Sequence, residues 1–377
     1  MVAATGSGPA PHADEWVNEL NCVAMPGLVN AHDHMYQWAT RGYVTDGTLF
    51  EWLRALYPVW ARIDAGTVRV AARAAMARLM LSGCTLSTDH HYVFPHGGHG
   101  IFEALVETAR ELGLRFHPCR GSMSLGESQG GLPPDTVVEE DDAILAHTEH
   151  HRVRLHTHLA ETLDEERFCV ERFGRRPVEL MEDLGWTGDD VWYAHGIHLN
   201  NAEIDRIAEV KTGIAHCPSS NMRLGAGACR VEHLVRAGAR VGLGVDGSAS
   251  NEDANLAMEA HLALLLARVR ASSAQALDAR GAWRLATRGG ADCLGRDDCG
   301  SLEPGKCADI ACFRVDDLAH AGIKDPLAGL ALAPPARAQT VLVNGRVVVR
   351  EGRLLTADED EITRDIAAAS RRLATGD

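Results

Sequence analysis

The chain has 377 residues, of which 46% are hydrophobic and 24% charged, so it carries enough apolar material for one large domain or two ordinary ones. Its formal net charge of −15 argues against a nucleic-acid backbone or an anionic membrane surface as a partner. No apolar run approaches the roughly 20 residues that cross a bilayer, and the N-terminal residues do not resemble a signal peptide. Ten cysteines are scattered without a C-x-x-C pair, which favours reduced thiols in a cytoplasmic protein.

From residue 26 to 295, short apolar runs alternate with helical patterns, which predicts parallel strands joined by crossover helices. The predicted strands span residues 27–32, 83–90, 114–121, 152–159, 190–196, 212–218 and 239–247. The predicted helices span residues 65–83, 100–113, 142–151, 165–174 and 231–239. A closed barrel of this kind has eight strands. The pattern therefore predicts a TIM-like (β/α) barrel that lacks one βα unit, between residues 121 and 152.

The pattern changes after residue 300. Residues 308–315 and 339–355 alternate or run β-branched, and Asn344-Gly345 stands between two apolar runs, which predicts a β-hairpin. Residues 359–374 have the pattern of a closing helix. We therefore expect a small β appendage on the barrel, followed by a helix.

The stretch "PGLVNAHDH" ends a predicted strand on two histidines. Residues two apart in a strand share a face, so His32 and His34 should project together and Asp33 away from them. An isolated pair of this kind is more often hydrogen-bonded than ligated to a metal. We expect Asp33 to support a neighbouring strand or loop rather than to bind a metal.

Three further predicted strands end on similar groups. "HTHLAE" gives His158 and, just past the strand, Glu161; "WYAHG" ends on His195; and "GLGVDG" ends on Asp246. Side chains at the carboxyl ends of barrel strands converge on one mouth, and imidazole with carboxylate suits zinc or ferrous iron. His156 lies one pleat deeper than His158 and is expected to support a ligand rather than to bind metal.

The glycines of "GLGVDG" also spell G-x-G-x-x-G, which is a dinucleotide-binding fingerprint when it opens an early βαβ unit with an acidic residue about 20 positions later. Here it falls in the last predicted barrel strand, so we reject that interpretation.

"PGLVNAHDH", "HTHLAE", "AHG" and "GVDGSASN", in this order, resemble the amidohydrolase superfamily and its mononuclear-metal deaminases of purines, pterins and triazines. The resemblance extends to "LEPGKCADI" and "VLVNGRVVVREG" near the C-terminus. Within the subgroup, "SGCTLSTDHHYVFP" and "RGSMSLGESQGGLPPDTVVEEDDAIL" look most like enzymes that act on 8-oxoguanine.

The resemblance implies one divalent metal ion, zinc or alternatively iron, with these ligands: His32, His34, His158 and Asp246. It implies catalytic roles for Glu161 as proton shuttle, His195 beside the attacked carbon, and Asp246 as acceptor of the water's proton. Zinc lowers the pKa of bound water to about 7, which creates a hydroxide nucleophile at neutral pH. The implied reaction converts an aromatic C–NH2 group into a carbonyl.

The implied function is hydrolytic deamination of a small heterocycle, with 8-oxoguanine the leading substrate and isoxanthopterin, guanine or a hydroxytriazine the alternatives. Gln37 and His90 are weaker candidates for substrate binding, beside His195. A homologue that binds metal without catalysing the reaction is the alternative from another class. The resemblance also implies a homo-oligomer.

The chain departs from the family in having only 25 residues before "PGLVN", where relatives have several strands of a small β domain. The expected division is therefore 1–25, a remnant of that domain; 26–295, the barrel; 296–355, a small β-sandwich-like domain truncated at its N-terminal side; and 356–377, a C-terminal helix. The missing βα unit coincides with the family's fourth strand and its helix.

Overall fold

The computed structural model describes residues 1–7, 12–13, 15–139 and 153–375. Its main sheet contains seven parallel strands, one at each predicted position, in the order β4-β3-β2-β8-β7-β6-β5. The strands are β2 (Leu28–Asn30), β3 (Cys84–His91), β4 (Arg115–Arg120), β5 (Leu155–Leu159), β6 (Val191–His195), β7 (Gly213–His216) and β8 (Arg240–Leu243). The sheet is a curled, parallel part-barrel of the TIM-like type, as predicted.

Strands β4 and β5 are the two edges of this sheet, and within the described ranges no strand pairs with both of them. The opening falls where the sequence predicted a missing βα unit. The helix predicted over 142–151 lies outside the described residues.

The other predicted barrel helices are present as α2 (Ala65–Leu81), α3 (Ile101–Leu112), α5 (Leu163–Phe173) and α9 (Val231–Ala237). Their ends follow local chemistry. Asp64 caps α2 by accepting a hydrogen bond from the Thr67 N–H at 2.7 Å, and Gly113 ends α3 with a φ of 76°, a left-handed conformation that favours glycine.

Further helices complete the shell around the sheet. They are η1 (Met35–Thr40), α1 (Leu49–Trp60), η2 (Glu127–Gln129), η3 (Asp135–Val137), α6 (Pro177–Asp183), α7 (Asn201–Val210), α8 (Pro218–Arg223), α10 (Ser248–Asn251), α11 (Leu256–Ala271), α12 (Ala279–Arg284), η4 (Leu285–Gly289), α13 (Gly290–Cys293) and α14 (Pro326–Leu332). In the part of the chain that the structure describes, no helix combines the length and apolar character needed to cross a membrane.

The barrel interior is apolar behind the strand ends. Val29, Leu86 and Ala215 pack there against the fully buried ring of Trp192. The Trp192 indole N–H donates to the Ala31 carbonyl at 3.0 Å, which satisfies its polar atom and ties β6 to the end of β2. This apolar cluster fills the interior of the part-barrel beneath the strand ends.

A second, five-stranded antiparallel sheet has the order β1-β9-β10-β11-β12. Its strands are β1 (Cys22–Pro26), β9 (Ile310–Arg314), β10 (Thr340–Val343), β11 (Arg346–Arg350) and β12 (Arg353–Leu354). The predicted hairpin joins β10 and β11, and Asn344 and Gly345 have φ of 52° and 81°, as a two-residue type I′ turn requires. The predicted division of the chain into domains stays a prediction.

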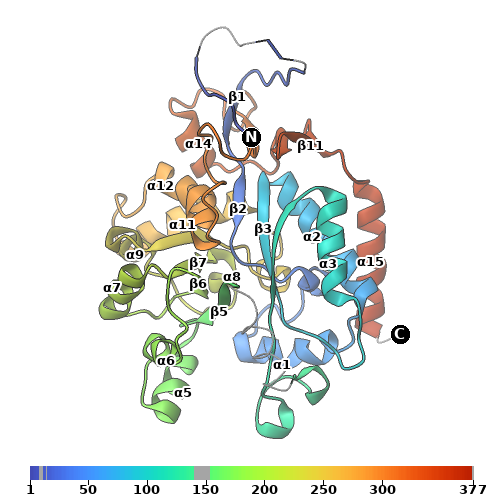
Figure 1. The fold of residues 1–377 in the computed structure, drawn as a ribbon, viewed down its shortest axis with the longest axis vertical. Helices are drawn as coiled ribbons and strands as arrows, with labels where there is room; N and C mark the ends of the chain where they lie inside the picture. The colour runs from blue at the N-terminus through green and yellow to red at the C-terminus, as the bar shows by residue number, and fades with distance from the viewer. Residues whose placement is uncertain (8–11, 14, 140–152, 376–377) are drawn as a thin grey trace.

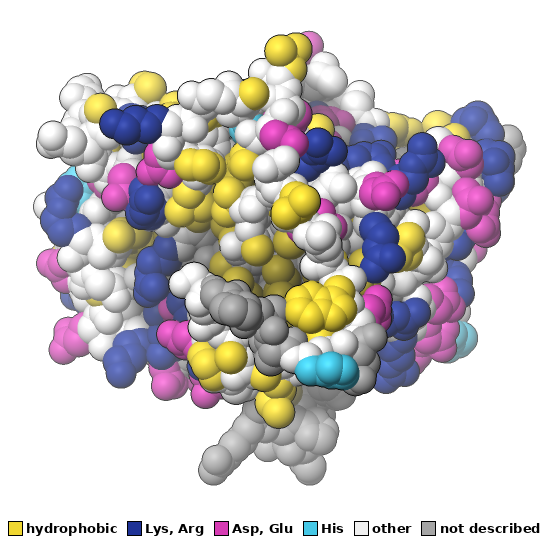
Figure 2. All heavy atoms as spheres, turned by 90° about the horizontal axis from the view of Figure 1, so that it is seen from above, with side chains coloured by type: hydrophobic (Ala, Val, Ile, Leu, Met, Phe, Trp, Pro, Cys, Tyr) yellow, Lys and Arg dark blue, Asp and Glu magenta, His cyan; other side chains and the backbone are white. Residues whose placement is uncertain are grey.

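The small sheet lies at one end of the molecule, and α1, α5 and α6 lie at the other, where the barrel strands finish (Figure 1). The predicted C-terminal helix is α15 (Glu359–Thr375), which packs along α2, where Arg73 and Glu361 form an ion pair at 3.1 Å. On the face at the small-sheet end, acidic and basic side chains are interspersed around a hollow of apolar side chains (Figure 2).

Candidate active site

The predicted metal ligands converge at the carboxyl ends of the barrel strands. The Nε2 atoms of His32 and His34 lie 3.2 and 3.4 Å from Oδ1 of Asp246. His34 Nε2 also lies 3.0 Å from Nε2 of His158. Strand β2 ends at Asn30, before the two histidines, yet the two side chains still project to one place.

His32 is held in one tautomer by a chain of hydrogen bonds. His156 Nδ1 lies 2.8 Å from the Trp192 carbonyl oxygen, which only accepts, so this nitrogen carries the proton. His156 Nε2 is then an acceptor, and it lies 2.8 Å from Nδ1 of His32, which donates to it. The chain leaves Nε2 of His32 unprotonated and buried, and no hydrogen-bond partner for it lies among the described residues. His156 therefore supports His32, as predicted.

The other two histidines have matching chemistry. His34 Nδ1 donates to the His90 carbonyl at 2.7 Å, so in the neutral ring Nε2 carries the lone pair. Burial lowers the pKa of His34 to about 3 and lowers that of His158 well below its ordinary value. Both imidazoles are therefore neutral at pH 7, which is the form that binds metal.

The spacing of these donors suits a single ion. Ligands that each lie about 2.0–2.2 Å from zinc must lie within roughly 4.4 Å of one another. The distances from Asp246 Oδ1 to His32 Nε2 (3.2 Å) and to His34 Nε2 (3.4 Å), and that between the Nε2 atoms of His34 and His158 (3.0 Å), meet this limit. One ligand atom each from His32, His158, His195 and Asp246 also lies within 4.8 Å of the others. His34 forms an overlapping group with His90 and His158.

Asp33 and Asp89 lie beside the site and brace its backbone. Asp33 accepts a hydrogen bond from the Asn30 side chain at 3.0 Å, and its carbonyl accepts from the His90 N–H at 2.8 Å. Asp89 accepts from the Met35 N–H at 2.9 Å. This supporting place for Asp33 agrees with its predicted role.

Glu161 and His195 stand on the other side of the group. His195 Nε2 lies 3.7 Å from a Glu161 carboxylate oxygen and 3.9 Å from Oδ2 of Asp246, while His195 Nδ1 donates to the Asn221 side-chain oxygen at 2.9 Å. Burial raises the pKa of the Glu161 carboxyl to about 7, with nearby His195 opposing the shift and Asp246 adding to it. A carboxyl with this pKa exchanges protons readily at neutral pH.

Three residues at these strand ends have left-handed backbones although none is glycine. The φ angles are 53° at Ala160, 73° at His195 and 63° at Asp246. Such conformations cost of order 1–3 kcal/mol each and cluster at functional sites, where the surrounding structure holds them. Ala160 directly precedes Glu161, so all three bear on side chains at the site.

A cavity of about 200 Å³ opens over these groups. Gln37 and His90 line it, and in the part of the chain that the structure describes each presents a buried polar atom without a partner: Oε1 of Gln37 and Nδ1 of His90. Sequence reasoning missed other lining residues, which come from separate elements: Leu49, Leu53, Tyr57, Tyr92, Ser122, Met123, Thr157, Leu224 and Ser250. Trp52 is buried and also lines the cavity.

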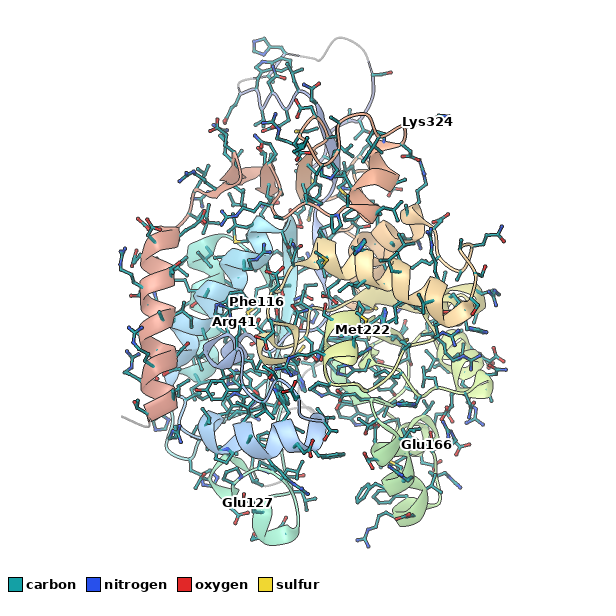
Figure 3. The ribbon with its side chains drawn as sticks, turned by 180° about the vertical axis from the view of Figure 1, so that it is seen from behind. Arg41, Phe116, Glu127, Glu166, Met222 and Lys324 are labelled. Atoms are coloured by element: carbon teal, nitrogen blue, oxygen red, sulfur yellow. The ribbon has the colours of Figure 1, made fainter. Side chains whose placement is uncertain are left out.

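No local signal separates Tyr57 or Leu224 from ordinary core residues, so only the fold could reveal them. Ser122 and Met123 follow β4, the third strand of the main sheet in chain order, so the loop after this strand reaches the cavity. Glu127 in that loop and Glu166 on α5 lie at the same end of the molecule (Figure 3).

The curled parallel sheet with histidines and an aspartate at its strand ends defines a barrel hydrolase with a candidate metal centre. The amidohydrolase family model matches residues 23–147 and 128–348. The chain therefore belongs to the amidohydrolase family.

Named relatives within this family act on carbon–nitrogen bonds. The chain is 44% identical to an 8-oxoguanine deaminase of Pseudomonas aeruginosa, over 98% of this chain and 92% of that protein. It is 34% identical to a hydroxydechloroatrazine ethylaminohydrolase of Pseudomonas sp. strain ADP, over 97% and 86% respectively.

A solved structure shares the fold. An atrazine chlorohydrolase from Arthrobacter aurescens TC1, in complex with zinc, superposes with a TM-score of 0.88 at 33% identity, covering 93% of this chain and 88% of that one.

Proposed function

We propose that this protein is a metal-dependent deaminase that hydrolyses 8-oxoguanine to urate and ammonia. The observation that carries the proposal is the convergence of three histidines and an aspartate on one point, with the Glu161 carboxyl beside them at a small cavity. The 44% identity to an 8-oxoguanine deaminase supports the choice of substrate.

The proposed ligands of a single ion are His32, His34, His158 and Asp246. Zinc is the proposed ion and iron the alternative, since this mixture of imidazole and carboxylate accepts either. The buried, unprotonated Nε2 of His32, which has no hydrogen-bond partner among the described residues, and the neutral state of His34 and His158 support this assignment. A bound divalent ion would act as a Lewis acid that makes water a nucleophile at neutral pH.

The chain's own groups would move the protons. Asp246 would accept the proton of the attacking water and return it to the departing ammonia. Glu161, with its pKa of about 7, would protonate the ring nitrogen next to the attacked carbon, which makes the ring a better electrophile. Burial opposes ionisation of His195, but Glu161 and Asp246 outweigh it and raise the pKa of this ring, so its Nε2 would also carry a proton and would stabilise negative charge on the oxygen of the tetrahedral carbon. The C–NH2 bond breaks, a C=O bond forms and ammonia leaves.

The size of the cavity favours a free base over a nucleoside. Its volume of about 200 Å³ is below the roughly 300–1,000 Å³ of pockets that take drug-sized ligands. The Gln37 amide and the His90 ring would form hydrogen bonds with the polar edge of the base. Isoxanthopterin, guanine and a hydroxytriazine are the alternative substrates, and a cytoplasmic homo-oligomer is the proposed state of the protein.

Ammonia release from 8-oxoguanine by zinc-loaded protein tests the proposal. We expect turnover by the wild type and a loss of about 10²–10⁴-fold in Glu161→Gln, because the variant cannot pass a proton. Glu166→Gln is the matched control, since Glu166 pairs with Arg176 and is not among the residues that line the cavity. Metal analysis should give one equivalent of zinc or iron in all three proteins.

Guanine, isoxanthopterin and a hydroxytriazine should be assayed beside 8-oxoguanine. A higher kcat/KM for one of them than for 8-oxoguanine would change the proposed substrate but leave the proposed reaction class unchanged. Bound metal without ammonia release from any of these rings would favour the catalytically inactive homologue and overturn the proposed function.

A further inference from the structure

The carboxylate of Glu165 holds the backbone that carries Glu161. Its Oε1 accepts a hydrogen bond from the Ala160 N–H at 2.8 Å, and its Oε2 accepts from the Glu161 N–H at 2.8 Å. Glu165 lies in the first turn of α5, where the Thr162 hydroxyl caps the helix by accepting from the Glu165 N–H at 3.2 Å. One side chain therefore bridges two successive peptide groups at the end of β5.

The same turn is held from its other side by the chain that follows β6. The Ala160 carbonyl accepts hydrogen bonds from the N–H groups of Ile197 and His198, both at 2.9 Å. Ala160 has a left-handed φ of 53°, a conformation that an alanine keeps only when its surroundings enforce it. The contacts of Glu165 and of the β6 loop supply that enforcement.

An ionised carboxylate satisfies both N–H groups, whereas an amide of the same length does not. An ionised Glu offers two acceptor oxygens, whereas Gln offers one oxygen and an NH2 group that would face an N–H donor. The neighbouring carboxylate, on Glu166, pairs with Arg176 instead and touches neither peptide group. The contact is thus particular to Glu165 and is not a general property of the acidic first turn of α5.

We infer that Glu165 is a positioning residue for the deamination: it fixes the Ala160–Glu161 turn so that the Glu161 carboxyl points into the cavity beside His195. The inference rests on the proposed function, because it concerns the aim of the proposed proton shuttle. Loss of the contact would let the turn relax and would displace the Glu161 carboxyl while the metal ligands stay in place.

Steady-state kinetics of Glu165→Gln on 8-oxoguanine tests the inference, with Glu166→Gln as the matched control. We expect kcat to fall about 10–100-fold in Glu165→Gln, as for other residues that orient groups at a metal site, with KM and metal content unchanged. We expect Glu166→Gln to keep the wild-type kcat (Figure 3 shows Glu166 on the same helix).

Glu203→Gln controls for a general loss of stability. Glu203 is a buried carboxylate that accepts from the Arg176 Nε at 2.9 Å and caps α7, and it does not line the cavity. If Glu203→Gln is destabilised as much as Glu165→Gln but keeps the wild-type kcat, the loss of kcat in Glu165→Gln comes from the turn and not from lower stability.

Hydrogen exchange gives a readout that does not depend on turnover. The amides of Ala160 and Glu161 should exchange slowly in the wild type and in Glu166→Gln, and faster in Glu165→Gln. An unchanged kcat or unchanged exchange in Glu165→Gln would overturn the inference. Failure of the wild type to deaminate any ring would overturn the proposed function instead, and the exchange experiment would still test the contact.

Discussion

At the scale of single residues, the proposed metal centre depends on which ring nitrogen of each histidine carries its proton. The Trp192 carbonyl determines the tautomer of His156, and His156 in turn determines that of His32. A backbone carbonyl that does not touch His32 therefore determines which of its ring nitrogens carries the lone pair. Supporting partners of this kind also raise the basicity of a ligand. Through this chain of hydrogen bonds, His156 would influence how tightly the proposed centre binds its ion.

Replacing His156 by Phe should lower metal affinity about 10–100-fold. The ring would keep most of its packing on Trp192, where the two ring centroids are 4.4 Å apart, but it could not accept from Nδ1 of His32. The His32 tautomer would then no longer be fixed. Competition with a chelator of known affinity measures the effect.

His117→Phe is the matched control, because His117 contacts the same indole, at 5.7 Å between ring centroids, without approaching His32. Equal affinity in wild type and His156→Phe would mean that the hydrogen-bond chain contributes nothing to binding.

At the scale of elements, a buried carboxylate connects two short helices that follow strands of the main sheet. Glu259 on α11 accepts hydrogen bonds from the Ser219 N–H at 3.1 Å and from the Asn251 side chain at 2.9 Å, so it joins α8 and α10. Burial raises the pKa of Glu259 to about 7 from an ordinary 4.5, with its hydrogen bonds opposing the shift. The charged form is therefore costly in the folded protein.

This shift makes stability depend on pH with a definite sign. Between pH 4.5 and about 7 the folded state binds the Glu259 proton more tightly than the unfolded state does, so the free energy of unfolding falls as pH rises through this window. The slope approaches ~1.4 kcal/mol per pH unit. Glu259→Gln does not titrate and should lack this contribution.

Denaturant unfolding of the wild type and Glu259→Gln at several pH values from 5 to 8 isolates the effect, because the other groups titrate in both proteins. The wild type should lose stability relative to the variant as pH rises towards 7, and the difference should level off above it. A difference that is constant across the window would contradict the assignment.

The elements that sequence could predict are those with a strong pattern of their own. Apolar runs located all seven strands of the main sheet, and Asn344-Gly345 located the hairpin, because only residues tolerant of positive φ fit its turn. Elements of four to six residues such as α8 and α10 were not predicted, since they are too short to show a period. The site residues carried chemical types that stand out at strand ends, whereas Tyr57 and Leu224 line the cavity only because the fold brings them there.

At the scale of the whole molecule, the two sheets are joined at the end opposite the candidate site. Arg115, the first residue of β4, makes two hydrogen bonds to Asp309, just before β9, at 3.0 and 3.1 Å. Asp309 also accepts from the Asn344 N–H at 2.6 Å, so one buried carboxylate links the edge of the main sheet to two segments of the small sheet. The Asp309 side chain is 3% exposed and that of Arg115 is 20% exposed.

Asp309→Asn should therefore weaken the junction of the two sheets without altering the chemistry. The neutral side chain keeps one acceptor oxygen and leaves the Arg115 guanidinium unpaired in a mostly buried place, which should cost about 3 kcal/mol in the free energy of unfolding. The variant should keep the wild-type kcat, because neither residue lines the cavity at the strands' other end.

Asp316→Asn is the control: it breaks the exposed pair with Arg314 at the far end of β9, and exposed pairs contribute about 0–1 kcal/mol. Denaturant unfolding of both variants, together with the ammonia assay, makes the comparison. If the two substitutions cost the same, the buried Arg115–Asp309 pair does not hold the sheets together; if Asp309→Asn lowers kcat at full metal occupancy, the small sheet acts on the candidate site through the barrel.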